Sequence, residues 1–459
     1  MRKIKEFLYL ILLSILKAAV RKKIKTVQPQ IVGVSGSVGK TSFIHLLHEV
    51  VQADFATRTT FQANSEAGLP LGILGLREKL KGFDFLSWLK VLCFVPAAAF
   101  SRAKDFNLLI AEMGIDGPRE PKNMSYLLKI VKPQIGVLLN VELVHTEQFS
   151  QVLPPAERDR KDRILALIAA EKGKIVTSLS PRAVAIVNGD SSYFKPLIAK
   201  IKAQLLTFGS AGNVDFRLTG HSCDLKGTVF EFIHQSAKYT LHLKNQHLFP
   251  AYGETIAAVV ATAWTLGIPV NTSIDRLEKM FHLPPGRFST LAGKKNSTIL
   301  DSSYNSSPKA LQAAIQLVGR LKVKGAKIAV LGDMRELGDL ACREHQKIAT
   351  LIQDHFEWAI LIGPLLKQYT YPELIQLGFP QDKILVFKTA EGVGEVILTQ
   401  ILKNQDLVLV KGSQNTLYLE TVVKSLLHKP EGAQDNLCRQ TDDWEKLRQR
   451  FFKAHPNNR

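Results

Sequence analysis

Cysteine is scarce in this sequence and offers no paired arrangement. Only four of the 459 residues are cysteines, Cys93, Cys223, Cys342 and Cys438, and they lie far apart along the chain. A zinc site needs closely spaced ligands, and a disulfide scaffold needs a much higher cysteine density. We therefore expect no structural disulfide or zinc site, and a reducing compartment. With 46% hydrophobic residues, the chain can instead form two or three ordinary hydrophobic cores.

The sequence also lacks a hydrophobic run that could span a membrane. Residues 7–20 are apolar except for Ser14 and Lys17, and as a helix they would be about 21 Å long, against about 30 Å for the core of a bilayer. A cleaved signal peptide does not fit, because the basic stretch 21–25 stands where a small-residue cleavage site belongs. We interpret residues 1–29 as a helix anchored on a membrane surface on the cytoplasmic side, with a helix packed on the protein body as the alternative.

A second apolar run, residues 91–100, is broken by Pro96 and predicts core or a partner surface.

Signals of nucleic-acid binding are absent although the chain is basic. The formal net charge is +19, and residues 1–29 hold eight Lys or Arg residues against Glu6, which is +7 of that total. No helix-turn-helix, zinc-finger or aromatic-basic strand pattern accompanies this charge. We therefore expect acidic substrates and an anionic membrane surface as partners, and no nucleic acid.

What the sequence does contain is a phosphate-binding turn, or P-loop, near its start. Residues 30–42 read QIVGVSGSVGKTS: a buried-strand pattern, a glycine-rich turn and the start of an apolar-periodic helix. Glycines let the backbone wrap around phosphate oxygens, Lys40 adds a cation at the outer phosphates, and the Thr41 hydroxyl can hold Mg²⁺. Val34 stands where the full motif has glycine, so this is the shorter Gly-x-x-Gly-Lys-Thr form. A turn without a ligand is the alternative. The nucleotide-binding residues predicted here are Gly36, Ser37, Gly39, Lys40, Thr41 and Ser42.

Strand-like and helical segments alternate along most of the chain, which predicts an α/β fold with mostly parallel sheets. Residues 205–245 change character, with shorter alternating runs that suggest an antiparallel edge or subsheet. After the Pro-Pro-Gly-Arg sequence at 284–287 the rhythm restarts. We predict a central ATP-binding domain over 30–290, a C-terminal α/β domain over 291–430 and a charged tail over 431–459.

Several short phrases occur in a characteristic order and spacing. In one-letter code they are GSVGKT at 36–41, NSEAGLP at 64–70, EMG at 112–114, NVELVH at 140–145, DSSYN at 301–305, GDMRELG at 332–338 and KGS at 411–413. Together they resemble the Mur ligases of peptidoglycan synthesis, and within that family the members that add D-alanyl-D-alanine. The resemblance covers residues 30 to about 425.

The resemblance implies a central P-loop ATPase domain followed by a Rossmann-like C-terminal domain, with ATP and Mg²⁺ as cofactors. A carboxylate is a poor acyl donor, so such a ligase phosphorylates it before an amine attacks, and metal ions and cations must offset the crowded negative charge. The implied substrates are a muramoyl-peptide precursor of the cell wall and D-alanyl-D-alanine. Because the two domains would share the site, domain closure is expected.

The metal-binding residues follow from matching this sequence to the family phrases. Glu112 ends an apolar strand, where the sites of parallel sheets lie, and with Thr41 it is implied as a Mg²⁺ ligand. His145 and Lys172 are implied to hold a second Mg²⁺, with Lys172 acting as a carbamate formed with CO₂. Lys174 is the alternative lysine, because it stands close enough to shift the match.

The C-terminal domain is implied to complete the nucleotide site. Asn305 would contact the adenine or ribose with Asp301 and Tyr304 beside it, and Arg287 would reach the phosphates. A plain turn is the alternative for residues 301–305, because Asp, Ser and Asn form turns readily. The remaining phrases add three candidates. Lys411 would face the amine substrate, and Asp333 and Glu336 would be site residues or helix caps. The catalytic residues implied by the resemblance as a whole are Lys40, His145, Lys172 and Arg287.

The chain also departs from the family pattern. The phrase Gly-x-His-Asn stands here as Asn-Gln-His-Leu at 245–248, and Gln414 replaces an arginine that follows the KGS phrase. Only about 30 residues precede the phosphate-binding turn, so the family's N-terminal UDP-binding domain is expected to be missing. Two other functions stay open: a ligase that extends a folate or an amino-acid polymer, and a membrane-recruited P-loop ATPase that ligates nothing.

Overall fold

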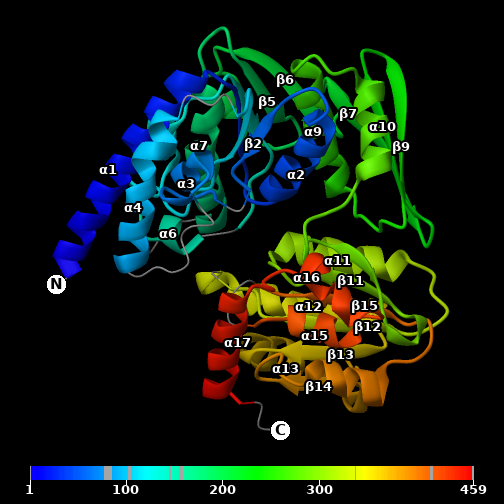
Figure 1. Cartoon of the computed structure of the whole chain (residues 1–459). Helices are drawn as coiled ribbons and strands as arrows, with labels where there is room; N and C mark the ends of the chain where they lie inside the picture. The colour runs from blue at the N-terminus through cyan, green and yellow to red at the C-terminus, as the bar shows by residue number, and fades with distance from the viewer. Residues whose placement is uncertain are drawn as a thin grey trace. The chain divides into compact units, whose positions relative to one another are not determined.

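The structure, a computed structural model, divides the chain into two compact units (Figure 1). It describes residues 2–61, 63–76, 85–101, 105–143, 146–154, 159–335, 337–413 and 417–456. The first unit comprises Met1–Gly220, Phe230–Leu241 and Ala251–Phe281, and the second comprises His221–Val229, His242–Pro250 and His282–Arg459. The chain forms a nine-stranded and a six-stranded sheet. Most of their strand pairs are parallel, with helices between the strands, so the predicted α/β fold is confirmed.

The nine-stranded sheet places the end of β1 between two parallel neighbours. Its order is β2-β3-β1-β4-β5-β6-β7-β8-β9. The strands are β1 (Gln30–Ser35), β2 (Thr57–Thr59), β3 (Leu108–Glu112), β4 (Ile135–Leu138), β5 (Val184–Asn188), β6 (Gln204–Gly209), β7 (Phe216–Asp224), β8 (Gly227–His234) and β9 (Ala237–Lys244). β1 pairs parallel with both β3 and β4, and Val34 stands opposite Glu112. The carboxyl ends of these strands therefore meet at one edge of the sheet, where α/β proteins bind their ligands.

The change of pattern expected after residue 205 begins at β7. β6 still pairs parallel with β5, whereas β7, β8 and β9 are neighbours joined by two-residue turns at 225–226 and 235–236. Gln235 and Ser236 have φ values of 47° and 67°, as a tight hairpin turn requires. Strands joined by such turns run antiparallel.

The N-terminal helix α1 (Arg2–Val27) packs on the first unit along one face. Leu13, Leu16 and Val20 lie in the buried core, and α1 contacts α3 (Gly68–Leu74), α4 (Phe85–Phe100) and α5 (Met124–Ile130). Figure 1 shows α1 and α4 side by side. The opposite face of α1 is exposed at Phe7, Leu8, Leu10, Ile11 and Ile15. The packed-helix alternative thus describes the inner face of α1. Within the described part of the chain, no helix combines the length and apolar character needed to cross a bilayer.

The remaining helices of the first unit surround its parallel strands. They are α2 (Lys40–Val51), α6 (Thr146–Ser150), α7 (Arg160–Thr177), α8 (Lys195–Ile198), α9 (Ala251–Thr265) and α10 (Val270–Met280). Of these, α2 and α7 matter most for the site, because α2 follows the phosphate-binding turn and α7 carries Lys172.

The second unit holds the six-stranded sheet, in the order β10-β11-β15-β12-β13-β14. Its strands are β10 (Ser289–Ala292), β11 (Thr298–Ser302), β12 (Lys327–Gly332), β13 (Trp358–Ile362), β14 (Ile384–Phe387) and β15 (Leu407–Lys411). β10 pairs antiparallel with β11, and the other pairs are parallel. The connecting helices are α11 (Pro308–Arg320), α12 (Ala341–His355), α13 (Tyr371–Gln376), α14 (Val393–Val396) and α15 (Glu420–Leu426). The βα rhythm after residue 287 therefore builds a sheet of its own.

Residues 431–459, expected as a charged tail, fold onto the second unit as far as the structure describes them. They form α16 (Ala433–Asn436) and α17 (Asp442–Ala454). Ala433, Leu437 and Phe452 belong to the same buried cluster as the central strands of the six-stranded sheet. Two arginines of this segment are buried against a carboxylate of α15.

Candidate active site

The predicted phosphate-binding turn lies between β1 and α2, at the carboxyl end of a central strand. Gly39 has φ 83°, a left-handed conformation that suits glycine, and α2 begins at Lys40. A Cβ on Gly36 would lie 3.0 Å from Leu139 Cβ, so the loop passes close to the neighbouring segment. The next residues, Thr41 and Ser42, are buried at the start of α2. The turn therefore has the backbone geometry that the motif predicts.

Asn140, two residues after the end of β4, holds this turn in shape. Its Oδ1 accepts from the backbone N–H groups of Ser37 at 3.0 Å and Val38 at 2.9 Å, and its Nδ2 donates to Val38 O at 3.0 Å. The Ser37 hydroxyl in turn accepts from Glu142 N at 2.9 Å. The NVELVH phrase thus fixes the P-loop from its first residues, a role that the sequence analysis did not assign.

Two lysines converge on the carbonyl oxygen of Gly36. Lys40 Nζ donates to Gly36 O at 2.7 Å and to Ser37 O at 3.2 Å, while Lys172 Nζ donates to Gly36 O at 3.2 Å. Lys172 is only 2% exposed. Burial, followed by the nearby charge of Lys40, holds the pKa of Lys172 well below its usual value, with Asp116 opposing the shift. A lowered pKa favours the neutral amine, which is the form that can react with CO₂.

The helical spacing of α7 explains why Lys172 rather than Lys174 lies inside. Ile164, Ile168 and Lys172 are buried at successive four-residue steps, which places them on one face of a helix. Lys174 lies on another side, where its side chain is 40% exposed and pairs with Glu171. Of the two candidate lysines, only Lys172 points at the P-loop.

A group of oxygen-bearing side chains lies beside the turn. Thr41 Oγ1 is 3.2 Å from both carboxylate oxygens of Glu112, and Asn64 Nδ2 donates to Glu112 Oε1 at 3.0 Å. Glu112 is 2% exposed, and its backbone N–H donates to Thr60 Oγ1 at 2.8 Å. A carboxylate and a hydroxyl next to a phosphate-binding turn are the ligands that Mg²⁺ prefers. Thr41 and Glu112 therefore fit the predicted metal role.

Three residues named from the sequence, His145, Glu336 and Gln414, lie outside the described residues. Of the two residues predicted to hold a second Mg²⁺, only Lys172 is described, and both roles stay predictions.

In the second unit, the predicted nucleotide residues gather in the loop that follows β11. Lys411, at the end of β15, donates to Ser302 Oγ and to Asn305 O, both at 3.0 Å. Asn305 Oδ1 accepts from Ser306 N at 2.8 Å, as asparagine does in turns. Lys411, expected to face the amine substrate, is thus buried and supports the loop from the neighbouring strand.

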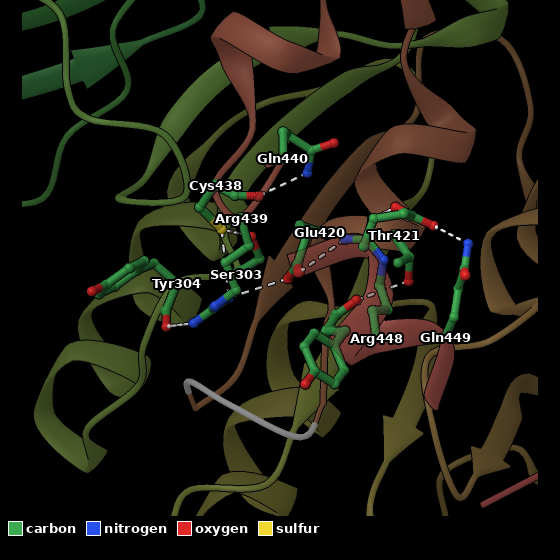
Figure 2. Close-up of polar contacts among 11 residues, drawn as sticks. Ser303, Tyr304, Glu420, Thr421, Cys438, Arg439, Gln440, Arg448 and Gln449 are labelled. Carbon is green, nitrogen blue, oxygen red and sulfur yellow. Dashed lines mark hydrogen bonds and ion pairs between the residues drawn. The ribbon is translucent and has the colours of Figure 1, made fainter. Parts of the chain in front are cut away.

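Tyr304 is held between residues 286–287, just before β10, and the C-terminal segment of the second unit. Its N–H donates to Gly286 O at 3.0 Å, and the guanidinium carbon of Arg287 lies 4.2 Å from its ring centroid. Gly286 has φ 72°, and a Cβ there would lie 3.1 Å from Tyr304 Cβ. Arg439 donates to Tyr304 O at 2.9 Å (Figure 2). The structure therefore brings together Arg287 and Tyr304, which the sequence placed in one site.

Asp301 is fully buried below this loop. One carboxylate oxygen accepts from Ser303 N at 2.9 Å, and the other has no hydrogen-bond partner among the described residues. Burial raises the pKa of Asp301 to about 6, against the pull of the Ser303 hydrogen bonds.

Asp333, the other candidate carboxylate, has a structural role. Its oxygens accept from the backbone N–H groups of Leu365 at 3.1 Å and Leu366 at 2.9 Å, at the start of the helix that follows β13. Free N–H groups at a helix start are commonly satisfied by such carboxylates. Asp333 therefore caps a helix, which was the alternative given for it.

Three contributors to these sites were missed or left without a role in the sequence analysis. Asn64 and Asn140 appear in the family phrases, but only the fold shows that their amides contact Glu112 and the P-loop. Arg439 stands in a segment that had been taken for a tail, and no local pattern indicated its contact with Tyr304.

Two protein-family models match the chain. The Mur ligase middle domain matches residues 34–250, which contain the P-loop, Glu112 and Lys172. The Mur ligase glutamate ligase domain matches residues 286–414, which contain Arg287 and the 301–305 loop. The two matches follow one another in the order that the short sequence phrases predicted.

Individual relatives agree with these matches. The UDP-N-acetylmuramoyl-tripeptide–D-alanyl-D-alanine ligase of Bacillus subtilis (strain 168) is 24% identical over 426 residues, covering 91% of this chain and 80% of the relative. The enzyme of the same name from Escherichia coli (strain K12) is 23% identical, covering 87% and 77%. The crystal structure of a MurF ligase from Thermotoga maritima in complex with ADP superimposes with a TM-score of 0.70 at 25% identity, covering 90% and 83%. The resemblance seen in the sequence is confirmed, and the chain belongs to the Mur ligase family.

Proposed function

We propose that this protein is an ATP-dependent, Mg²⁺-dependent ligase that joins D-alanyl-D-alanine to a muramoyl-peptide precursor of the cell wall. The γ-phosphoryl group of ATP passes to the peptide carboxylate, giving an acyl phosphate and ADP. The amine of D-alanyl-D-alanine then attacks the acyl carbon, and inorganic phosphate leaves as the amide bond forms. The curated relatives carry this activity in their names.

The observation that carries the proposal is the contact between the P-loop and Glu112. A triphosphate held by Lys40 and the turn would lie next to the Thr41 hydroxyl and the Glu112 carboxylate, which are 3.2 Å apart. These two side chains would hold Mg²⁺, and the ion would offset negative charge as the phosphoryl group transfers. A simple phosphate-binding turn needs no buried carboxylate at this place.

The second metal position is proposed for Lys172, as its carbamate, together with His145. The buried amine with its lowered pKa supports the carbamate. Formation of the carbamate releases one proton and turns a potential cation into an anionic ligand. In the second unit, Asn305, Asp301, Tyr304 and Arg287 are proposed to contact the nucleotide.

Release of ADP and phosphate across a panel of acceptors and amines tests the reaction. We expect turnover that requires both a UDP-muramoyl tripeptide and D-alanyl-D-alanine. Turnover with folate and glutamate, or with an amino-acid polymer, would identify a different ligase. ATP hydrolysis that ignores every added carboxylate and amine would instead favour the P-loop ATPase alternative.

Lys40→Ala tests the link between the P-loop and this reaction. The turn glycines remain, but the cation at the outer phosphates is lost, so we expect turnover to fall by about a hundredfold or more. Lys174→Ala is the matched control, because Lys174 is a partly exposed lysine paired with Glu171. Near-normal turnover of Lys40→Ala would remove the P-loop from the mechanism.

We also propose that the protein works at the inner face of the cytoplasmic membrane, through the outer faces of α1 and α4. Five apolar side chains of α1 are exposed, and Phe94 and Phe100 of the adjacent α4 are exposed as well. Arg21, Lys22 and Lys25 follow on the exposed part of α1. An apolar stripe that continues into basic residues fits the surface of an anionic bilayer, where each basic residue adds about 1 kcal/mol of attraction.

Sedimentation with vesicles of phosphatidylserine and phosphatidylcholine tests this contact. Because α1 also contributes to the core, the variant should change only its outer face: Phe7→Ser, Ile11→Asn and Ile15→Asn together. The matched control replaces three scattered exposed residues, Leu225, Ile375 and Leu447, by asparagine. We expect only the outer-face variant to stay in the supernatant at low salt, with ligation of a soluble acceptor unchanged. Equal sedimentation of both variants would disprove the membrane contact.

A further inference from the structure

The C-terminal segment reaches the proposed nucleotide loop through two neighbouring side chains, Cys438 and Arg439. The segment follows α15 and lies beyond residues 286–414, the part that the family model covers. Arg439 and its neighbour Cys438 are buried, with Cys438 Sγ 3.7 Å from Ser303 Oγ. Figure 2 shows the Arg439 side chain extending between Tyr304 and Glu420.

The guanidinium group of Arg439 connects the loop to α15. One nitrogen, Nη2, donates to the backbone oxygen of Tyr304 at 2.9 Å, and the other, Nη1, donates to Glu420 Oε2 at 3.1 Å. Its central carbon also lies 5.0 Å from the centroid of the Tyr304 ring. The planar fork of arginine can make both hydrogen bonds at once, which a lysine cannot do in the same geometry.

Glu420 makes this arrangement stable, because it pairs with two arginines. Its side chain is 0% exposed, and its second oxygen accepts from Arg448 Nη1 at 3.4 Å. Burial raises the pKa of Glu420, while Arg439 and Arg448 oppose that shift. A buried charge is costly unless it is paired, and Glu420 is paired here through a separate oxygen with each arginine. Arg448 pairs with Glu420 and Glu445 but, among its described contacts, with no residue of the 301–305 loop.

We infer that Arg439 is a positioning residue for nucleotide binding, holding Tyr304 and Asn305 in the conformation that receives ATP. Both backbone polar groups of Tyr304 are then held, its N–H by Gly286 O and its carbonyl oxygen by Arg439. The inference rests on the proposed role of this loop in binding the nucleotide. It assigns the C-terminal segment a part in ligand binding rather than in stability alone.

Steady-state kinetics of the full chain with two pairs of variants tests this. We expect Arg439→Met to raise the KM for ATP by about tenfold and Arg439→Lys by about threefold, with kcat changed by less than about twofold, because only positioning of the loop is lost. The KM for D-alanyl-D-alanine should stay unchanged. Arg448→Met and Arg448→Lys are the matched controls, since they disturb the same carboxylate without touching the loop. Their melting temperatures should fall as much as those of the Arg439 variants, with the KM for ATP unaltered.

Asn305→Ala separates the inference from the function on which it rests. If Asn305→Ala leaves the KM for ATP unchanged, the loop does not bind the nucleotide. Asn305 is then not part of the proposed nucleotide site. If Asn305→Ala raises the KM but neither Arg439 variant does, only the positioning role is wrong. An equal rise of the KM for ATP in the Arg439 and Arg448 variants would also overturn the positioning role. The change in KM would then follow the loss of stability that both pairs of variants share. Should Arg439→Met fail to fold, Arg439→Lys against Arg448→Lys decides the question.

Discussion

The Thr41 hydroxyl lies 3.2 Å from both carboxylate oxygens of Glu112, although 71 residues separate the two in the chain. Thr41 stands in the first turn of α2, and Glu112 is the last residue of β3. The parallel register of β1 and β3, with Val34 opposite Glu112, brings the end of β3 beside the turn that follows β1. The proposed metal site is therefore a direct product of strand pairing.

We expect Glu112→Gln to abolish most of the ligase activity and to leave the fold intact. The amide can still hydrogen-bond to Thr41 and Asn64, so the free energy of unfolding should change by no more than about 1 kcal/mol. The charge that attracts Mg²⁺ is lost, and the Mg²⁺ concentration for half-maximal turnover should rise by about tenfold or more. A titration of turnover with Mg²⁺ checks this. Unchanged Mg²⁺ dependence would exclude Glu112 as a ligand.

Lys172→Ala should be inactive and should recover part of its activity with added small carboxylates such as acetate or formate. The added anion replaces the carbamate that the buried amine would form, and CO₂-depleted wild-type protein should recover with bicarbonate for the same reason. Lys174→Ala is the control and should retain nearly full activity, because Lys174 is partly exposed and pairs with Glu171. An active Lys172→Ala variant would contradict the carbamate.

Asp301 predicts a pH dependence of stability. Its pKa is raised from 3.8 to about 6 in the folded protein, so between these values the folded state binds more protons than the unfolded chain. The free energy of unfolding contributed by this residue must then fall as the pH rises from about 4 to 6. Relative to wild type, the free energy of unfolding of Asp301→Asn should gain about 2 kcal/mol between pH 4 and pH 7. Urea unfolding of both proteins at the two pH values measures the gain, and an equal difference at both would refute it.

The two faces of α1 predict opposite outcomes for neighbouring substitutions. Leu16 is 0% exposed and packs in the core of the first unit, whereas Ile15 is 43% exposed. Leu16→Ala should lower the free energy of unfolding by about 3 kcal/mol, and Ile15→Ala should change it by less than about 0.5 kcal/mol. Thermal unfolding of the two variants checks this. Equal stability would mean that α1 does not contribute to the core.

The sequence by itself determined the features that depend on neighbouring residues. A buried strand, two glycines, a lysine and a threonine predicted the phosphate-binding turn, because backbone freedom and helix initiation are local properties. The order of βα segments likewise predicted two mostly parallel sheets, since burial on both faces leaves continuous apolar strands. The family phrases were local as well, and they named Glu112, Lys172 and the 301–305 loop in advance.

Only the tertiary structure decided which of these residues meet and which are buried. The choice of Lys172 over Lys174 depends on which face of α7 packs toward the P-loop. The contact of Arg439 with Tyr304 joins residues 135 positions apart. Arg439 stands in a segment expected as a charged tail, and its partner, Glu420, lies in α15. Long-range pairing of buried charges depends on packing rather than on local propensity, and for that reason no sequence pattern could show it.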